Sequence, residues 1–539
     1  MTQIVARISK GLQRRWLQSV NNRHIARLAA DVERQAPDEL LGGPVAFFNA
    51  SSRLAWMSQN AAFTLISAWA LRLTGTPVVH FVCNAGMTRC QLGTNRNDPN
   101  EKPPCDVCVK QSQHLYPQSQ VDWFNYNLDT ELDDTVRGLM LPELMEFTWQ
   151  GLPLGELVLP SLRWALRRHH LENNPGTLYL FRQYLLSAWN VAVEFTRFLN
   201  EQQPQGLVVF NGIAFPEAIA RRLAQLRGLW VVTHEVGLQP YTAYFTHGQA
   251  TAYPIDIPAG YRLNQAQDER LNRYLQERMK GNFSMAGIRF WPEMAGLGEE
   301  FLKKAAGFKQ IVPVFTNVIF DTSQSHANVI FPHMFAWLDE VARLIRNHPK
   351  TLFVIRAHPD EERPGKTAEE SVAGWVEKKG IAALPNVVFV ASSEYLSSYD
   401  LIQRSKFVLV YNSTIGLEAS IMGAAVLCGG KARFTQIPTV FLPSSPEEFH
   451  HLAEKFIKTD SIEVPAEFQQ NARTFLYYQL FKTSLPFGHL LEADLTPGFV
   501  RFKKDVRWQD FQVEGSESVQ ALVEGFLHNG SFLLPNGGD

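Results

Sequence analysis

The chain has 539 residues, a formal net charge of -2 and a hydrophobic content of 45%. This length exceeds what one ordinary hydrophobic core accommodates, so we expect two large domains. The nearly balanced charge argues against a nucleic-acid-binding protein, and no apolar run reaches the roughly 20 residues that span a bilayer. We therefore expect a globular protein of the cytoplasm without a nucleic-acid partner.

Residues 1–40 form a predicted N-terminal helix that is basic and loosely amphipathic, beginning "MTQIVARISKGLQRRWLQSV". Two interpretations are open. Charged helices of this kind are usually solvated surface helices. The same pattern occurs in helices that lie on anionic lipid, so a peripheral contact with the inner membrane is the second interpretation.

Residues 41–260 contain β-rich runs separated by helical stretches. The runs are "PVAFFNAS", "PVVHFVC", "GLVVFNG" and "LWVVTHE", and helices are expected over 56–73 and from Phe215 onward. This alternation predicts a Rossmann-like α/β domain. A helical insert is expected over 130–202, where aromatic and aliphatic residues recur at helical spacing, and we interpret that stripe as core packing.

Four of the five cysteines lie in one loop, residues 83–108: Cys83, Cys90, Cys105 and Cys108. The two-residue gap between the last two lets two thiolates converge on one metal ion, and a reducing cytoplasm disfavours disulfides. We expect a structural zinc ion, with an iron–sulfur cluster or free redox thiols as alternatives. A site with four protein ligands would be closed, so it would brace the loop and take no part in catalysis.

From residue 311 onward, short apolar runs alternate regularly with helical stretches. The runs are "IVPVF", "TLFVIR", "NVVFVA", "KFVLVY" and "AAVLC", and the helices are expected over 332–347, 367–379, 394–404 and 415–422. Such runs are typical of a parallel sheet buried on both faces. We predict a second Rossmann-like domain over 311–460, a linker over 261–310, and a C-terminal helical region and tail over 461–539. The expected fold class is thus α/β with two doubly wound domains.

Polar residues follow the strands of the second domain, and ligands of parallel sheets bind beyond the carboxyl ends of the strands. Arg356 and His358 come at the end of "TLFVIR", and a histidine there can donate to a phosphate oxygen. The alternative is an ordinary loop histidine. Candidates at the other strand ends of this domain are Thr316, Asn317, Ser392, Ser393, Asn412, Ser413, Thr414 and Lys431.

The stretch "NSTIGLE" after the fourth strand combines a helix start with a carboxylate. Small hydroxyl residues here are either helix N-caps or part of an anion site made by free N–H groups. A capping box that begins at Thr414 would place its glutamate at 417, where the sequence has Leu417. Glu418 instead lies one turn along the same helix face, where it can accept hydrogen bonds from a ribose. Gly416 would permit close approach of a ligand.

The order "RAHP" and then "YNSTIGLEASIMGAAVLCGG" resembles the nucleotide-binding half of GT-B glycosyltransferases that build bacterial capsule and lipopolysaccharide, in particular the Kdo-transferase and sialyltransferase-like groups. The resemblance covers residues 311–445. It implies a nucleotide-sugar donor and a glycan or glycolipid acceptor. It also implies that His358, Ser413 and Thr414 contact the donor phosphate and that Glu418 binds the ribose.

In a protein of this layout, the first domain supplies the acceptor pocket and the general base. Strand ends there carry Asn211, His234 and Glu235, and we expect Glu235 to be the base, with His234 second and His247 a weaker candidate. The alternative for Glu235 is a solvated loop carboxylate.

The expected reaction is inversion by direct displacement, with His358 and the helix start stabilising the leaving group. The sequence has no Asp-x-Asp metal motif, since "DDT" at 133–135 falls in the helical insert, so we expect catalysis without a metal cofactor. Rival functions are a nucleotide-sugar 2-epimerase, a non-catalytic scaffold with a zinc loop, and phosphotransfer from a nucleotide-activated alditol.

Overall fold

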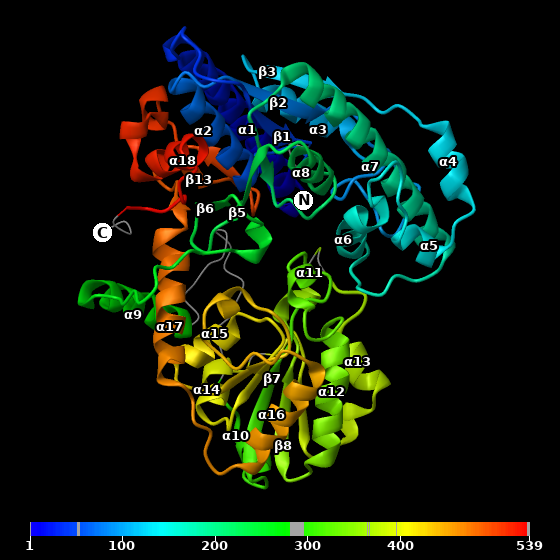
Figure 1. Ribbon diagram of the computed structural model, residues 1–539, viewed down its shortest axis with the longest axis vertical. Helices are drawn as coiled ribbons and strands as arrows, with labels where there is room; N and C mark the ends of the chain where they lie inside the picture. The colour runs from blue at the N-terminus through cyan, green and yellow to red at the C-terminus, as the bar shows by residue number, and fades with distance from the viewer. Residues whose placement is uncertain are drawn as a thin grey trace.

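The computed structural model shows two α/β domains stacked along the longest axis of the molecule (Figure 1). It describes residues 2–50, 54–280, 296–363, 365, 367–394 and 396–535, with the backbone alone described for residues 2–10. Residues 281–295 of the expected linker lie outside this description. The linker segments that are described form α9 (Gln265–Met279) and α10 (Glu299–Ala305).

The first domain is built on a seven-stranded sheet of order β12-β6-β5-β4-β1-β2-β3. Five of these strands are parallel: β1 (Val45–Asn49), β2 (Val78–Cys83), β3 (Gln120–Phe124), β4 (Gly206–Phe210) and β5 (Trp230–Val236). The two remaining strands, β6 (Thr242–Thr246) and β12 (Leu485–Pro486), are antiparallel to their neighbours. The parallel strands therefore all end at one edge of the sheet.

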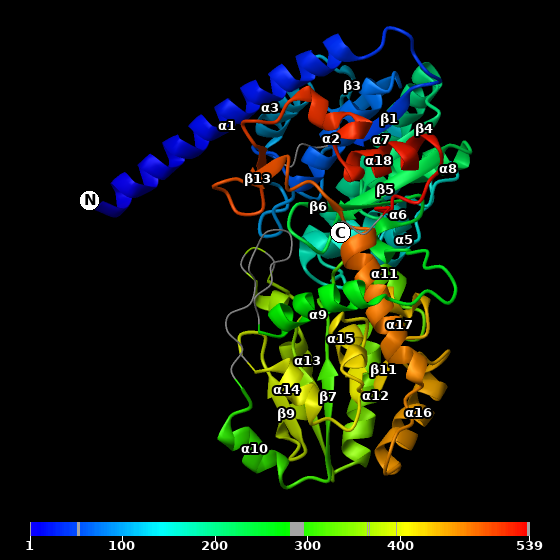
Figure 2. The same cartoon turned by 90° about the vertical axis from the view of Figure 1, so that its left-hand side faces the viewer.

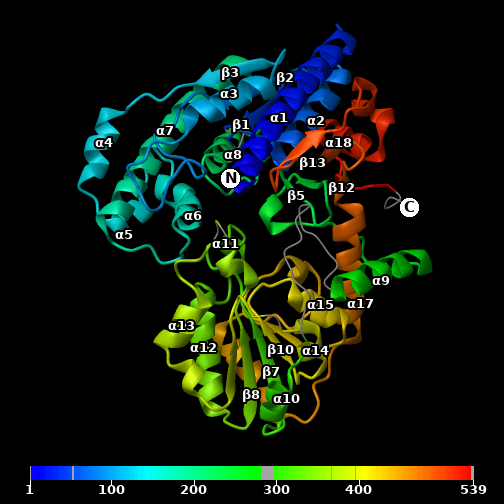
Figure 3. The same ribbon diagram turned by 180° about the vertical axis from the view of Figure 1, so that it is seen from behind.

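Helices cover both faces of this sheet. One face packs against α1 (Thr2–Gln35), α2 (Gln59–Leu73) and α18 (Glu517–Leu527). The other packs against α8 (Glu217–Leu226) and the insert, which comprises α4 (Thr130–Arg137), α5 (Leu141–Met145), α6 (Leu154–Leu166) and α7 (Pro175–Gln202). Leu180, Phe181 and Tyr184 of α7 are fully buried, so the expected core stripe is confirmed. Figure 3 shows the insert reaching down from the first domain, with α6 above the second.

The second domain is built on a five-stranded parallel sheet of order β11-β10-β7-β8-β9. Its strands are β7 (Gln310–Phe315), β8 (Thr351–Arg356), β9 (Val387–Val390), β10 (Val408–Val410) and β11 (Val426–Cys428). Its helices are α11 (Gln324–Ala327), α12 (Met334–Asn347), α13 (Val372–Lys378), α14 (Ser398–Gln403), α15 (Ile415–Ile421) and α16 (Pro446–Lys458). They form separate buried clusters on the two faces.

Both sheets share one topology. Neighbouring strands follow the order β3-β2-β1-β4-β5 in the first sheet and β9-β8-β7-β10-β11 in the second. In each of these sets, the strand that comes first in the chain lies between the second and the fourth. This is the doubly wound Rossmann order, so the predicted fold class is confirmed. The strand order reverses between β1 and β4 and again between β7 and β10, and ligands of such sheets bind at that point, beyond the strand ends.

The C-terminal region returns to the first domain. After α17 (Ala466–Tyr477), β12 pairs with β6, the hairpin β13 (Leu491–Ala493) and β14 (Val500–Phe502) packs beside α1, and α18 packs on α2. The prediction of a separate helical region over 461–539 is wrong here, because it missed these strands, each of which has only two or three residues. Residues far apart in the chain thus complete one core, including Phe63 and Phe487.

The N-terminal helix α1 projects beyond the body of the first domain (Figure 2). Its C-terminal half packs on the core through Ile25, Leu28 and Val32. Toward its N-terminus, Leu12 and Trp16 are 62% and 58% exposed. Among the described helices, none combines the length and the apolar character needed to cross a membrane. The short helix α3 (Cys105–Leu115) begins at the end of the cysteine-rich region and packs beside α1.

Candidate active site

Two asparagines contact each other at the point where the strand order of the second sheet reverses. The backbone N–H of Asn412, after β10, donates to Oδ1 of Asn317, after β7, over 3.3 Å. Oδ1 of Asn412 in turn accepts a hydrogen bond from Nε2 of Gln324 in α11, also over 3.3 Å. The structure thus brings Asn317 and Asn412 together at the position where a doubly wound sheet binds its ligand.

Thr316 and Arg356 lie deeper at the same edge. Oγ1 of Thr316 donates to the carbonyl oxygen of Arg356 over 2.9 Å, which ties the end of β7 to the end of β8. The Arg356 guanidinium donates to the carbonyl oxygen of Leu396, and burial lowers its pKa to about 10. Both residues are almost fully buried, at 2% and 6% exposed. They hold the loops of this edge in place, and their role in donor binding remains a prediction.

His358 lies at the start of the short 3-10 helix Pro359–Glu362. Its Nδ1 accepts the backbone N–H of Asp360 over 3.1 Å. Burial, assisted by the nearby Arg356 charge, lowers the pKa of the ring, while Asp360 and Asp321 act in the opposite direction. The ring is therefore neutral near pH 7, and because Nδ1 is an acceptor, its hydrogen is on Nε2. That tautomer suits a donor to a phosphate oxygen.

The hydroxyl groups at the remaining strand ends differ in exposure. Ser392 and Ser413 are buried, and Ser393 and Thr414 are exposed. Thr414 occupies the N-cap position of α15, but its side chain makes no capping hydrogen bond, so the capping interpretation does not explain it. Lys431 is exposed after β11, and its backbone N–H donates to the carbonyl oxygen of Ala327 over 3.0 Å.

Glu418 is engaged by two neighbours. Its Oε1 lies 2.7 Å from both Nε and Nη2 of Arg278 in α9, and its Oε2 accepts the Tyr399 hydroxyl over 2.5 Å. The side chain is only 6% exposed. Binding of a ribose to Glu418 would require these contacts with Arg278 and Tyr399 to change, so the ribose role remains a prediction. The interpretation of Gly416 is corrected: a Cβ there would lie 3.0 Å from Cγ2 of Val410, so the glycine serves packing of α15 on β10.

The first domain contributes Asn211 and Glu235 at the ends of β4 and β5. Nδ2 of Asn211 donates to Oε1 of Glu235 over 2.5 Å. Asn211 has a positive φ of 61°, and its Oδ1 accepts the N–H groups of Ile213 and Ala214. The amide is thereby fixed, so its N–H group points at the carboxylate. A positioned carboxylate at a strand end suits the expected general base.

The two histidines predicted for this domain lie elsewhere. His234 is 1% exposed and its ring stacks on Phe245 at 5.1 Å, because neighbouring residues of a strand point to opposite faces of the sheet. His247 is exposed, and its Nε2 lies 3.1 Å from the carbonyl oxygen of Gly525 in α18. The Asn211 side chain therefore contacts Glu235, and its backbone N–H donates to the carbonyl oxygen of His234 over 2.9 Å.

A group of cationic residues at the domain boundary escaped the sequence analysis. Burial and the positive charges of Arg221, Lys431 and Arg433 lower the pKa of His326 to about 4. Arg221 belongs to α8 of the first domain and the others to the second, so positive charge converges from both sides. Like charges held close together favour a bound anion. The sequence did hold one sign of this cationic group, since Arg433 comes two residues after Lys431, the last residue of the "CGGK" segment.

Tyr253 connects the cationic group with Glu235. The Arg433 guanidinium lies 3.9 Å from the centre of the Tyr253 ring, whose hydroxyl donates to the carbonyl oxygen of Val236 over 2.6 Å. Burial and the negative charges of Glu235 and Asp321 raise the pKa of Tyr253 to about 12, with Arg433 opposing them. Carboxylates and cations from the two domains therefore surround one buried tyrosine.

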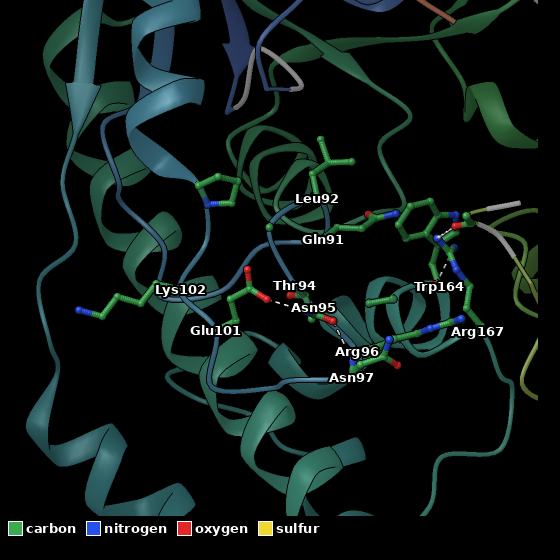
Figure 4. A pocket seen from close by; sticks show the side chains of 14 residues that line it. Gln91, Leu92, Thr94, Asn95, Arg96, Asn97, Glu101, Lys102, Trp164 and Arg167 are labelled. Carbon is green, nitrogen blue, oxygen red and sulfur yellow. Dashed lines mark hydrogen bonds between the residues drawn. The ribbon is translucent and has the colours of Figure 1, made fainter. Parts of the chain in front are cut away.

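A cavity of about 410 Å³ lies along the same boundary (Figure 4). Its walls come from the cysteine-rich loop, the end of α6 and Gly365 of the second domain, and they include Gln91, Asn95, Glu101 and Trp164. The inner wall connects to the first-domain site, because the Ser161 hydroxyl donates to Oε1 of Gln91 and accepts the backbone N–H of Phe215. The cavity is polar and within the size range of small-ligand sites.

Three histidines hold the domains together beside this cavity. His170 Nδ1 lies 2.6 Å from Oε1 of Glu370, and its Nε2 lies 3.3 Å from Nε2 of His333. His169, His170 and His333 offer nitrogen atoms within 4.8 Å of one another. Nδ1 of His333 caps α12 by accepting the N–H of Ala336, which leaves its hydrogen on Nε2. A chain of hydrogen bonds from His333 through His170 to Glu370 accounts for this arrangement.

Comparison with known proteins gives one family. Residues 303–455 match the family described as "Capsule polysaccharide biosynthesis protein". These residues contain the second sheet and its strand-end side chains. No curated protein sequence matches the chain.

Several solved structures resemble the chain at low identity. KpsC of Thermosulfurimonas dismutans, "beta Kdo 2,7 transferase", is 14% identical over 63% of this chain and 90% of that chain, with a TM-score of 0.31. The "beta Kdo 2,4 transferase" of the same KpsC is 11% identical over 57% and 87%, with a TM-score of 0.34. A putative UDP-N-acetylglucosamine 2-epimerase of Listeria monocytogenes is 11% identical over 91% and 98%, with a TM-score of 0.28. The fold assignment rests on the sheet topologies described above.

Proposed function

We propose that the protein is a glycosyltransferase of surface polysaccharide synthesis that moves a sugar from a nucleotide-sugar donor to a glycan or glycolipid acceptor. The observation that carries this proposal is the convergence of strand-end groups from both sheets: Asn211 with Glu235 on one side, and Asn317, Asn412 and the cationic residues on the other. The family match of residues 303–455 supports the capsule context.

The donor lies, in this proposal, beyond β7 and β10. Its phosphates face Arg221, Lys431, Arg433 and the Nε2–H of His358. Ser413 and Thr414 at the start of α15 also contact the phosphates, and the ribose lies toward Glu418. Cations and oriented N–H groups stabilise the charge that develops on a departing phosphate. These side chains supply positive charge from the protein itself, so we propose that transfer proceeds without a metal ion and with inversion.

The acceptor enters from the first domain. Glu235, held by Asn211, removes the proton of the attacking hydroxyl group as that oxygen displaces the nucleoside phosphate at the anomeric carbon. The cavity of about 410 Å³ is the acceptor side of the proposal, since its polar side chains and Trp164 suit a glycan and its wall connects to the loop after Asn211. Closure of the two domains over both substrates would exclude water.

Incubation with nucleotide sugars and lipid-linked oligosaccharides, followed by mass spectrometry, tests the proposal. The expected product is an acceptor extended by one sugar, formed by the wild type and by His247→Gln, and lost in Glu235→Gln while donor binding is kept. Conversion of the donor to its epimer without an acceptor would contradict a transferase and support the isomerase.

We also propose that the projecting end of α1 rests on an anionic membrane. Leu12 and Trp16 are four residues apart on one helix face, both exposed, with Arg14 and Arg15 between them. Co-sedimentation with anionic vesicles is expected for the wild type and reduced in Leu12→Ala/Trp16→Ala. Equal recovery with neutral and anionic vesicles would contradict this contact.

A further inference from the structure

The four cysteines of the cysteine-rich loop line a single cavity. Cys83 ends β2, Cys90 follows in the loop, and Cys105 and Cys108 lie in the first turn of α3. All four, which lie within the described residues, are outside any disulfide and are partly buried. Cys105 and Cys108 are three residues apart on a helix, so they point to the same side. Four thiols from three chain segments thus converge on one small space.

The spacing of the sulfur atoms decides between the two kinds of metal site. In a tetrahedral zinc site with Zn–S bonds of about 2.3 Å, the sulfurs lie roughly 3.8 Å apart. Among the described residues, which include all four cysteines, no three of these thiols have their sulfurs within 4.8 Å of one another. The thiols therefore stand further apart than the ligands of a single zinc ion, although they share one cavity.

The cavity has room for more than one atom. Its volume is about 30 Å³, and roughly 10–15 Å³ is enough for one water molecule. Besides the cysteines, its walls are mostly apolar and include Leu54, Met87 and Val109. An apolar pocket with cysteines spread around it suits a polynuclear iron–sulfur cluster, which is held by thiolates at its corners.

Two glycines of the loop place their backbone close to the sulfur atoms of Cys83 and Cys90. The N–H of Gly86 donates to Sγ of Cys83 over 3.2 Å. Gly86 and Gly93 follow Cys83 and Cys90 at the same distance of three residues, and a Cβ on Gly93 would lie 3.1 Å from Sγ of Cys90. A Cβ on Gly86 would lie 2.2 Å from the Phe124 ring. Such N–H groups stabilise the negative charge of thiolate ligands.

We propose that Cys83, Cys90, Cys105 and Cys108 bind a polynuclear iron–sulfur cluster. The protein then supplies every terminal ligand of the irons, so none of them is left open to a substrate. The cavity shares Leu92, Gly93 and Pro104 with the larger cavity at the domain boundary. The bound cluster therefore fixes the wall of that boundary cavity. This inference stands whether or not the chain is a glycosyltransferase.

The test is the metal content of the wild-type chain purified without oxygen from iron-supplied cells. We expect about two or about four iron atoms per chain with an equal number of inorganic sulfides, broad visible absorption, and a paramagnetic resonance signal after one-electron reduction. Stoichiometric zinc without iron would overturn the proposal, as would a chain with neither metal after anaerobic reconstitution with ferrous iron and sulfide.

Cysteine-to-serine variants test which cysteines hold the cluster. Cys105→Ser/Cys108→Ser is expected to lose the iron, the sulfide and the visible absorption. Cys428→Ser is the matched control, because Cys428 is buried in β11 of the second domain and should leave the iron content unchanged. Full iron content in the double variant would overturn the assignment of these ligands. If the double variant does not fold, the iron and sulfide content of the wild type still decides.

Discussion

Arg278 and Glu418 form a buried ion pair that ties the helix α9, which precedes the second domain, to α15 of that domain. Nε and Nη2 of the arginine both lie 2.7 Å from Oε1 of the glutamate, and the two side chains are 15% and 6% exposed. The interaction with this carboxylate raises the pKa of Arg278 despite its burial. The carboxylate expected to bind a ribose is thus already a structural element of the free protein.

Removing one member of this pair should destabilise the second domain. Arg278→Met and Glu418→Gln each leave a buried polar group without its partner, and we expect a loss of about 3–5 kcal/mol in the free energy of unfolding for either. Replacing both together, as Arg278→Met/Glu418→Gln, should cost less than the sum of the two single losses. Urea unfolding measures all three, and additive losses in the double variant would contradict a coupled pair.

The Asn211–Glu235 contact predicts a kinetic effect without a binding effect. Asn211→Ala removes the hydrogen bond that positions the proposed base, and a bond to a charged group contributes about 1.5–3 kcal/mol. We expect kcat to fall by about 10-fold to 100-fold while the KM for the donor is unchanged. Steady-state kinetics with varied donor measure both constants. A raised donor KM with normal kcat would instead place Asn211 in donor binding.

Much of the fold follows from local pattern, because buried parallel strands are runs of apolar residues. The predicted run "TLFVIR" coincides with β8, and the helix expected over 332–347 differs from α12 by two residues at one end. The strands β12, β13 and β14 could not be predicted in this way. They are too short to show alternation, and only pairing with a distant segment makes them strands.

The candidate site was likewise only partly predictable from the sequence. The ends of the predicted strands pointed to Asn317, Asn412 and Glu235, and the structure brings Asn317 to Asn412 and Glu235 to Asn211. Their roles in binding and catalysis remain predictions. The partner of Glu418 is 140 residues away in a helix of polar composition, and no local signal connects the two. Arg221 was missed for a related reason, since an arginine on an amphipathic helix is ordinarily a solvated residue.

Glu361 gives the second domain a pH-dependent stability. Its carboxyl group is 2% exposed, both oxygens accept the N–H of Val372, and burial raises its pKa to about 8. The folded chain therefore keeps a proton that the unfolded chain releases near pH 4.3. Between about pH 4.5 and about pH 8, the free energy of unfolding should fall by up to about 1.4 kcal/mol per unit as the pH rises.

Glu361→Gln has no charge to bury, so its stability should not show this decline. Urea unfolding across the same pH window compares it with the wild type, and Glu394→Gln, at an exposed position, serves as the control. A variant that declines as steeply as the wild type would contradict the assignment.

The three histidines at the domain boundary predict that the free energy of unfolding falls as the pH is lowered, which is opposite to the effect of Glu361. Burial and the charges of Arg163, His170 and His333 lower the pKa of His169 to about 3. Unfolding restores an ordinary pKa near 6.5, so this contribution to stability is present above about pH 6.5 and is lost as the pH falls toward about 3. Glu370, which accepts from His170, faces the same cluster.

His169→Gln should therefore lose less stability on acidification than the wild type does. Thermal unfolding below pH 6.5 measures the difference, with His450→Gln on α16 as a control that leaves this boundary intact. Identical acid profiles for wild type and His169→Gln would show that the cluster does not titrate on unfolding.

Calorimetric titration with CMP-, UDP- and GDP-sugars asks whether a nucleotide sugar binds where the two sheets meet. We expect one of the three classes to bind the wild type, and Lys431→Ala/Arg433→Ala to weaken that binding by about 10-fold or more, since two cations facing the phosphates are lost. Arg343→Ala, on the exposed side of α12, should bind as the wild type does. Absence of binding by all three classes, or equal affinity in the Lys431→Ala/Arg433→Ala variant, would contradict a donor site at this boundary.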